Sequence, residues 1–407
     1  MATFKTISSA DIKTTQSVLN QLIDFVEEDV SGSATRKKYQ VFVTSSGDNA
    51  VTSSVYHTIY DQNFTLQTAN ELFDITMGLY QDGTTVSTAQ SSTDVNGKRL
   101  FPQEAMMMRE KINVYRQYAQ LLLGNATSRF TAPFSNPASS GADNIDEALF
   151  LSFKRLFVRD GIKRETFAVQ MFQSSSFGSH TFGTTALGNI VGKQNINVSS
   201  TNPASGSAIF TDVGSATSVE RSATGGDVGN LVNAANTSET VGLLFYQQGI
   251  AVLDMTKAFK GNQFITGSIQ TVGSSQNNLN FSGSFVPDFL VSASMDQILD
   301  HVATSRFGSG SNTVLTFQNN TRLNSTLVYC RATADEFNFS SNPTYTNSEG
   351  RIRVINTGQE NIEKAFSFVT TIGLYDANEE LLAIAKLSRP VEKNDEKDLT
   401  FRVRLDF

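Results

Sequence analysis

The side chains that most often carry chemistry are few in this chain and stand far apart. His57, His180 and His301 are its three histidines, and none has a second histidine or cysteine at metal-ligand spacing. The single cysteine, Cys330, follows the apolar run 327–329, which favours a buried small hydrophobe over a nucleophile. The sequence therefore predicts no zinc site, no internal disulfide and no cysteine-based catalysis.

Two groups of carboxylates are the remaining candidates for acid–base catalysis or calcium binding. Asp335 and Glu336 are adjacent on an extended segment, so we expect their side chains to point to opposite sides in a solvated turn. The run 392–398 mixes acidic and basic residues between two predicted strands, which is typical of a solvated loop. His301 follows Asp300 in a predicted helix and is interpreted as a surface residue. The sequence therefore predicts no catalytic residue, no cofactor-binding residue and no metal ligand.

The composition accounts for this scarcity of chemistry-bearing side chains. Of 407 residues, 17% are charged and 39% hydrophobic, both below the usual values for soluble domains, whereas small neutral polar residues are abundant. The chain has 30 Phe and 10 Tyr but no Trp, which favours filling of cores and interfaces by rings without polar groups. A formal net charge of -7 without a basic tract argues against general nucleic-acid binding. No stretch is apolar enough for a signal peptide or a membrane span, so we expect a soluble protein made in a cytoplasm.

Four segments are predicted to be helical from apolar spacing or from their capping residues. They are 11–29, 103–123, 144–159 and 294–306. In the first of these, Leu19, Leu22 and Ile23 fall on one face of a helix. In the last, Ser294 and Gln297 have the spacing of a capping box.

Most of the remaining chain has the period-2 alternation of strands. The predicted strands are 39–43, 54–60, 165–171, 241–246, 250–255, 263–269, 313–317, 325–333, 351–355, 366–375, 381–387 and 399–407. The run 376–380 has the composition of a hairpin loop. In the last strand one face is apolar, and its residues are candidates for a subunit interface: Leu399, Phe401, Val403, Leu405 and Phe407. We expect Phe407 to be buried because it ends a regular strand.

These elements predict an α+β fold that is rich in β structure. We expect mainly antiparallel sheets or a sandwich, with three to four amphipathic helices and more than one domain. The predicted division is an α+β domain over 1–173, a Ser/Gly/Thr-rich insertion or arm over 174–240, and a β-rich domain over 241–407 with one helix near 294–306.

Several segments resemble one protein family. The second predicted helix lies in FPQEAMMMREKINVYRQYAQLLLG, and the C-terminal block reads TTIGLYDANEELLAIAKLSRPVEKNDEKDLTFRVRLDF. With 31–46, 150–172, 285–307 and 314–346, these stretches resemble virion structural proteins of contractile-tailed marine phages of the cyanophage myovirus type. The resemblance covers nearly the whole chain apart from 174–240, and the C-terminal block is its most specific part.

The resemblance implies a non-enzymatic component of a phage virion that is made in the host cytoplasm and assembled into the tail. A wedge-type subunit of the baseplate is favoured, and a neck or tail-completion protein is the alternative. The implied partners are other tail and baseplate proteins and further copies of the chain, with no nucleic acid and no membrane. The family supplies no catalytic residues.

Two other classes of function stay open at this point. A host-binding adhesin or fibre would show repeats, a trimeric coiled coil or aromatic clusters at loop tips, and the sequence has no repeat and no heptad run. A cell-wall hydrolase would require converging carboxylates or a Cys/His pair, for which Asp335 and Cys330 are the only starting points. The long neutral β-rich segments instead favour assembly through sheet edges, which supply main-chain hydrogen bonds without charge.

Overall fold

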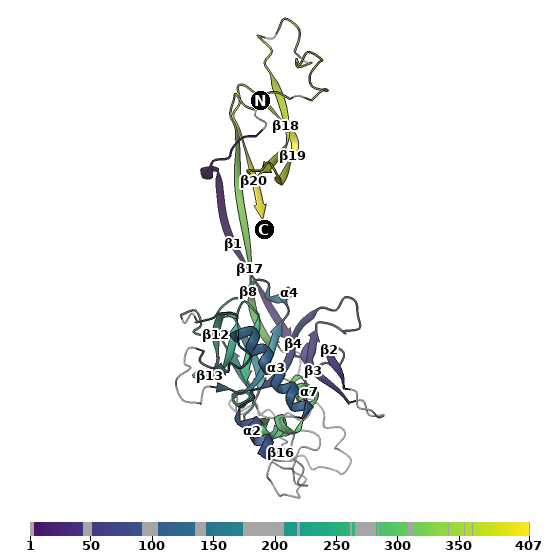
Figure 1. The fold of residues 1–407 in the computed structure, drawn as a ribbon, viewed down its shortest axis with the longest axis vertical. Coiled ribbons are helices and arrows are strands. Elements are labelled where there is room, and N and C mark those ends of the chain that lie inside the picture. The colour runs from purple at the N-terminus through teal and green to yellow at the C-terminus, as the bar shows by residue number, and fades with distance from the viewer. Residues whose placement is uncertain are drawn as a thin grey trace. The chain divides into compact units, whose positions relative to one another are not determined.

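A computed structural model describes residues 4–43, 51–91, 105–134, 144–173, 207–217, 220–260, 263–264, 282–283, 285–307, 313–340, 342–353, 355–359 and 361–406. The chain divides into two compact units (Figure 1). We call Leu19–Thr321 the central unit, and Met1–Val18 together with Arg322–Phe407 the terminal unit. The division falls inside two long strands, β1 (Ile12–Val26) and β17 (Thr313–Ala332).

The central unit is built on a large sheet in which every paired strand with a described register is antiparallel. From β17 the order of strands is β9, β10, β12, β13, β14, β7, β4, β3, β2, with β8 beside β17 and β11 beside β12. Their bounds are β2 (Arg36–Val43), β3 (Val51–Tyr60), β4 (Glu71–Leu79), β7 (Glu147–Phe153), β8 (Gly161–Ile162), β9 (Ala168–Phe172), β10 (Ser207–Thr211), β11 (Glu220–Ser222), β12 (Gly226–Asn233), β13 (Asn236–Phe245) and β14 (Ile250–Asp254). Two short pairs lie outside this sheet, β5 (Phe130–Thr131) with β6 (Asn144–Ile145) and β15 (Gln263–Phe264) with β16 (Ser282–Gly283).

The middle of this sheet is covered on both faces. Every residue of β14 is buried, and six of the seven residues of β7 are buried. The sequence of a strand that is buried on both faces is a continuous run of apolar residues and does not alternate between apolar and polar ones. In the core of this unit, Phe25, Phe73, Phe153 and Phe317 form an aromatic cluster in which neighbouring ring centroids are 5.1–6.1 Å apart. The abundant phenylalanine therefore fills the core, as the composition predicts.

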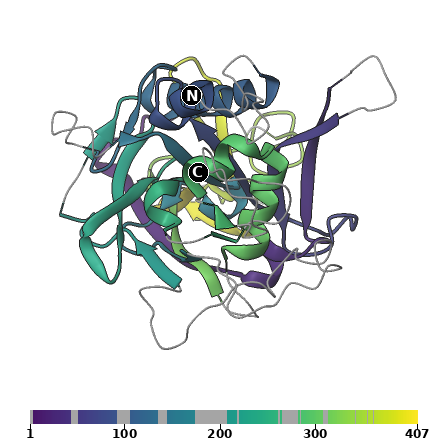
Figure 2. The same ribbon diagram turned by 90° about the horizontal axis from the view of Figure 1, so that it is seen from below.

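Helices of the central unit pack against the sheet and against each other. The longest are α3 (Met106–Leu123) and α7 (Met295–Ser305), which both contact β4 and also contact one another (Figure 2). The shorter helical segments are α1 (Glu27–Ser31), α2 (Thr84–Ser91), α4 (Arg155–Val158), α5 (Met255–Ala258), η5 (Phe285–Phe289) and α6 (Leu290–Ser292). At Gly78 on β4 an added Cβ would lie 2.7–2.8 Å from Tyr115 atoms, so the absent side chain lets α3 approach the sheet.

The terminal unit is smaller and has a small core. The β17 segment within this unit pairs with β20 (Leu399–Asp406), with Val328 opposite Val403. A second pair, β18 (Phe366–Tyr375) with β19 (Leu381–Asn394), forms a separate two-stranded sheet. Val328, Val403 and Leu374 are the buried residues of this core. A short 3-10 turn, η1 (Ser9–Asp11), precedes β1.

Two of the four predicted helices are wrong. Residues 12–29 form β1 and the start of α1; of the predicted helix face Ile23 is buried, whereas Leu19 and Leu22 are each 58% exposed. Residues 144–159 form β6, β7 and the four-residue α4, because the run from Ala148 to Phe153 crosses the buried middle of the sheet. In both cases apolar residues at helical spacing also suit a strand.

The other two helices are confirmed where they are described. Residues 106–123 form α3, which ends at Gly124 with a left-handed φ of 80°. The capping box of α7 is present, with Ser294 accepting from the backbone N–H of Gln297 and the Gln297 side chain accepting from that of Ser294. Residues 103–104 lie outside the described residues.

The predicted strands are mostly confirmed, with changes of length. The strands predicted at 313–317 and 325–333 are one strand, β17, and β19 continues to Asn394, so the predicted loop 392–398 begins later. The segment 351–355 has an isolated bridge at Ile352 as its one described β contact. Of the strand predicted at 263–269, Gln263 and Phe264 are described and lie in β15. The sequence analysis missed β4 and α2.

The class of fold is confirmed at its coarser level, as a β-rich protein with mostly antiparallel sheets. The division of the chain differs from the predicted boundaries at 173/174 and 240/241. The strands β9, β10, β12 and β13 are neighbours in one sheet across both positions, and hydrogen bonding within a sheet joins them into one unit. Residues 174–206 of the predicted arm lie outside the described residues.

Candidate functional site

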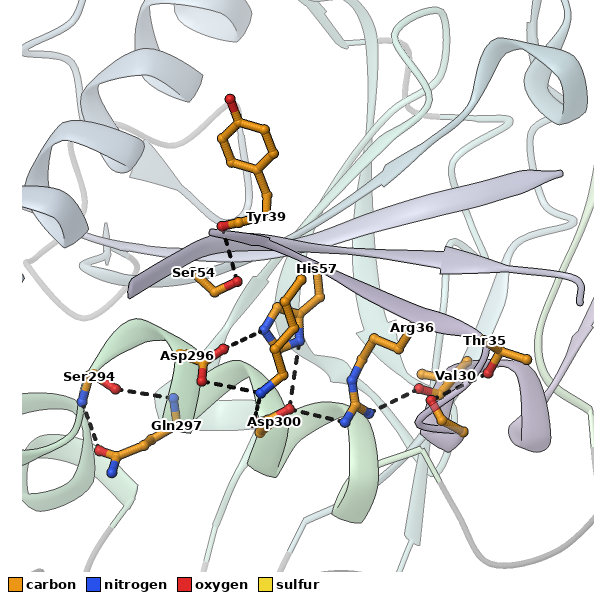
Figure 3. Close-up of polar contacts among 12 residues, drawn as sticks. Val30, Thr35, Arg36, Tyr39, Ser54, His57, Ser294, Asp296, Gln297 and Asp300 are labelled. Atoms are coloured by element: carbon orange, nitrogen blue, oxygen red, sulfur yellow. Dashed lines mark hydrogen bonds and ion pairs between the residues drawn. The ribbon is translucent and has the colours of Figure 1, made fainter. Parts of the chain in front are cut away.

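The densest group of charged side chains in the described chain joins α7 to the strands β2 and β3 of the central unit (Figure 3). We call it the His57 cluster; its members are Arg36, Lys38, His57, Asp296 and Asp300. The two aspartates are four residues apart on α7 and therefore share one helix face. The three basic side chains come from neighbouring strands that pair in antiparallel register.

Hydrogen bonds connect all five side chains. Asp296 Oδ1 lies 3.1 Å from Nε2 of His57, and Asp296 Oδ2 accepts from Nζ of Lys38 at 3.2 Å. Asp300 accepts from Nη2 of Arg36 at 3.0 Å and also from Lys38. With a neutral imidazole, the cluster holds two positive and two negative charges and is balanced.

Burial and pairing act in opposite directions on the pKa values in this cluster. Burial lowers the pKa of His57 below its ordinary value, although the hydrogen bond to Asp296 and the charge of Asp300 act to raise it. Burial alone would raise the pKa of Asp296, but its bonds with His57 and Lys38 outweigh that effect and lower it. A neutral imidazole of His57 and an ionised Asp296 are therefore the resting state near neutral pH.

An aspartate–imidazole pair is the arrangement that orients a general base, but this ring is in the wrong place for such a role. His57 is 0% exposed, so a substrate has no access to it. Its second nitrogen, Nδ1, has no hydrogen-bond partner within the described residues, and its closest carboxylate oxygen, on Asp300, is 4.0 Å away. The cluster fastens α7 to the sheet, and we assign it no reaction.

Two further basic side chains are fully buried in the central unit. Lys111 donates from Nζ to the backbone oxygens of Leu290 and Ala293 at 2.7 Å each, and burial lowers its pKa to about 7. Arg306 donates from Nη1 to Phe172 O at 3.3 Å, and burial lowers its pKa to about 9. Both connect the segment 285–307 to elements elsewhere in the sequence.

The interpretation of His301 as a surface residue is wrong. Its Nε2 accepts a hydrogen bond from Nε of the buried Arg306 at 3.2 Å, and the ring is partly buried beside Phe285. His301 follows Ile298 by three residues and so lies beside the buried apolar stripe of α7. Spacing along the helix could not reveal an arginine partner five residues later. His180 lies outside the described residues.

The carboxylates that the sequence singled out lie in a solvated turn, as predicted. Asp335 accepts from the Thr333 hydroxyl at 2.7 Å, and Glu336 accepts from the Thr333 N–H at 3.0 Å and from Lys5. The bond from Lys5 and those from Thr333 lower the pKa of Glu336 to about 2. Both acids cap the end of β17 and are ionised at neutral pH.

Cys330 is half-buried and lies opposite Phe401 in the register of β17 and β20. It packs against the small core of the terminal unit, and burial raises the pKa of its thiol. A raised pKa keeps the thiol protonated near neutral pH, which makes it a poor nucleophile.

The candidate interface residues of the last strand alternate as predicted. Val403 is buried, Leu399, Phe401 and Leu405 are half-buried, and the residues between them are exposed. This apolar face turns toward the small core of its own unit, where Val403 and Leu405 pack. Phe407 lies outside the described residues. That these side chains contact another subunit stays a prediction.

The exposed apolar surface that the sequence analysis missed lies on the neighbouring hairpin. We call it the hairpin patch; its residues, with exposed fractions of 45–70%, are Phe4, Tyr375, Leu381, Leu382 and Ile384. Phe4 packs edge-on against Tyr375 with ring centroids 4.9 Å apart. At roughly 100 Å² for each side chain, the patch exposes on the order of 500 Å² of apolar surface, near the upper end for a monomer. The sequence shows the alternation of the strand but not that this face lacks a cover.

A hollow of about 780 Å³ also lies in the terminal unit, in the loops between β17 and β18. Among the described residues, its lining includes Arg351, Arg353 and Ile352 and no histidine or carboxylate. Arg353 donates from Nε to the backbone oxygen of Thr346 at 2.8 Å, so its guanidinium is used within the loop. The described part of this lining offers no acid–base pair.

Within the described part of the chain, no group of three or more His, Cys, Asp or Glu side chains could hold a metal ion. None of the described helices is long and apolar enough to cross a membrane. Comparisons of the chain with protein families, with curated proteins and with solved structures found no match.

Proposed function

We propose that this chain is a non-enzymatic structural component of a phage virion, and specifically a wedge-type subunit of the tail baseplate. The observation that carries the proposal is the hairpin patch on a two-stranded sheet of the terminal unit. Uncovered apolar surface of this size on a sheet is the typical starting point of a protein–protein interface. The sequence resemblance to virion proteins of contractile-tailed phages is the reason for proposing a phage tail as the assembly to which this interface belongs.

The mechanism of such a protein is geometric. The central unit provides a rigid scaffold, because its β7 and β14 strands are buried and its α7 is held by the His57 cluster. The terminal unit provides the contact surface, because its own core is small and its outer apolar side chains are exposed. Neighbouring tail proteins and further copies of the chain would cover that surface in the particle.

The polar groups of the described chain support this assignment. Two of the buried ionisable side chains are bonded within the protein, Lys111 to the backbone and His57 to Asp296. The exposed carboxylates Asp335 and Glu336 cap a turn. These four groups therefore each have a structural role.

The proposal is tested on purified phage particles. We expect mass spectrometry to find the chain in particles, and antibody labelling in electron microscopy to place it at the distal end of the tail. Label at the junction of head and tail would favour the neck alternative. Particles that lack the chain altogether would refute the assignment to the virion.

A further inference from the structure

The strand β19 has one free edge. Within the described part of the terminal unit, its only strand partner is β18. The register with β18 shifts between Leu374 and Tyr375, so that Leu381 and Leu382 come together at the start of β19 and both side chains are exposed. Free sheet edges that carry apolar side chains are templates for pairing with another strand.

The far end of β19 is protected from such pairing. The register shifts again beyond Lys386, and Pro390 lies in this irregular stretch without a backbone N–H to donate. Proline and bulges are the devices that natural sheets use to blunt an edge. The free edge is therefore confined to the segment that begins after the turn and ends near Lys386.

The charges around this segment are self-complementary. Glu380 stands before its apolar residues and Lys386 after them, and no ion pair among the described residues engages either side chain. An antiparallel pair of two β19 strands about a two-fold axis at Ala383 places Glu380 of each copy opposite Lys386 of the other. The same register places Leu382 opposite Ile384, which are 70% and 59% exposed. Opposite charges and large apolar side chains are the cross-strand pairs that stabilise a sheet.

We propose that a second copy of this chain occupies the β19 edge, so that the two hairpins form a four-stranded antiparallel sheet across a two-fold axis near Ala383. This inference rests on the proposed function and names one of its partners. A two-fold contact uses the same patch on both copies, and the matching positions of Glu380 and Lys386 about Ala383 satisfy that condition. A strand from a different tail protein would not in general carry opposite charges at the positions that face Glu380 and Lys386.

Charge reversal of the full-length chain tests the pairing. In Glu380→Lys two lysines face each other at both ends of the contact, and in Lys386→Glu two glutamates do. We expect each variant alone to raise the dissociation constant of the dimer about tenfold, since two favourable pairs become repulsive. Because the two variants carry opposite charges at the contact, an equimolar mixture is expected to recover the wild-type constant as a mixed dimer. Sedimentation velocity over a concentration series measures these constants.

Glu349→Lys is the matched control, because Glu349 is an exposed acid of the same unit outside the β19 edge. It is expected to leave dimerisation unchanged, whereas Ile384→Asp is expected to abolish it. Circular dichroism of each variant verifies that it is folded.

Two results would overturn the inference. One is a wild-type chain that stays monomeric throughout the micromolar range, and the other is a mixture of the two reversal variants that dimerises no better than either alone. Neither result bears on the presence of the chain in particles. Conversely, if the chain dimerises in solution but is absent from phage particles, the β19 contact is supported and the proposed function is refuted.

Discussion

The buried imidazole of His57 and the partly buried imidazole of His301 make stability depend on pH. Burial holds the pKa of both rings below the ordinary value of 6.5. In the unfolded chain a histidine takes up its proton as the pH falls through 6.5, whereas the folded rings resist protonation. At these two rings the unfolded state therefore binds more protons, so the stability that each ring contributes falls as the pH falls below 6.5, whereas the raised pKa values of Asp29 and Glu147 act in the opposite direction. We expect urea unfolding to show a loss of at most about 2 kcal/mol for each ring between pH 7.5 and pH 5.

His57→Gln should flatten this dependence while keeping a polar side chain beside Asp296. The comparison is the change in unfolding free energy between the two pH values, in the wild type and in the variant. His301→Gln is the parallel test beside Arg306. If both substitutions left the pH dependence unaltered, other groups would have to account for it.

The buried Lys111 is expected to make the free energy of unfolding depend on pH in a higher range. Its folded-state pKa is about 7, whereas an unfolded lysine titrates near 10.5. Between these values the unfolded state holds the additional proton, so this group makes stability rise as the pH rises. From pH 7 to pH 9 the stability of the wild type should rise by about 2 kcal/mol relative to Lys111→Met. The exposed Lys13→Met is the control, and equal slopes for wild type and Lys111→Met would contradict the prediction.

The capping box of α7 gives a prediction for an element. Ser294→Ala removes the side chain that accepts from the Gln297 N–H, and we expect it to cost about 1 kcal/mol of unfolding free energy. Ser8→Ala is the matched control, because Ser8 caps only the exposed three-residue turn η1 and should cost less. Equal costs at the two sites would mean that the cap contributes nothing specific to α7.

The approach of α3 to β4 gives a second element-scale prediction. A methyl group at Gly78 would meet backbone atoms of Tyr115, which cannot move like the end of a flexible side chain. We expect Gly78→Ala to destabilise the central unit by about 1–3 kcal/mol, as overpacking of a core does. At Gly350 an added Cβ meets nothing within 4 Å, so Gly350→Ala carries backbone strain without a clash and should cost about 1 kcal/mol.

The elements also show what local sequence can and cannot determine. Ser294 and Gln297 predict the start of α7 correctly, because a capping box needs only two residues that are three positions apart. The structure has both hydrogen bonds of this box. The spacing of Leu19 and Leu22 fits one face of a helix, which predicts a helix. A strand with both faces exposed has no required pattern of apolar residues, so β1 can carry leucines at the same positions. The run from Ala148 to Phe153 was misassigned because burial on both faces of a sheet removes alternation, and burial depends on strands far away in the sequence.

The same limit applied to the candidate site. The hairpin turn at 376–380 was predictable from its composition, and Asp376 does accept from the N–H groups of Asn378 and Glu380. That the outer face of the hairpin stays uncovered depends on what packs nearby, which the sequence does not state. The His57 cluster has members from three elements and no motif. The spacings of Arg36 and Lys38 on β2 and of Asp296 and Asp300 on α7 are local, but the contact between these pairs is not.

At the scale of the whole molecule, the two units differ in how much core they contain. The central unit buries the large aromatic cluster around Phe25 and Phe153, whereas Val328, Leu374 and Val403 are the buried residues of the terminal core. Local stability follows the amount of apolar surface buried, so we expect two steps of opening. Amide hydrogen exchange should be faster in β18 and β19 than in β7 and β14.

Substitution in each core separates the two steps. Val403→Ala deletes buried methyl groups in the terminal unit and should cost about 1–3 kcal/mol there, with faster exchange in β17, β18 and β20. The protection of β7 and β14 should stay at its wild-type level, because additivity holds for sites without shared partners. Leu151→Ala in the middle of β7 is the reciprocal variant, since Leu151 is 0% exposed. If either variant lost protection from exchange uniformly across both units, the molecule would open as one cooperative body. The terminal unit, with its small core, would then depend on the central unit for its folded state.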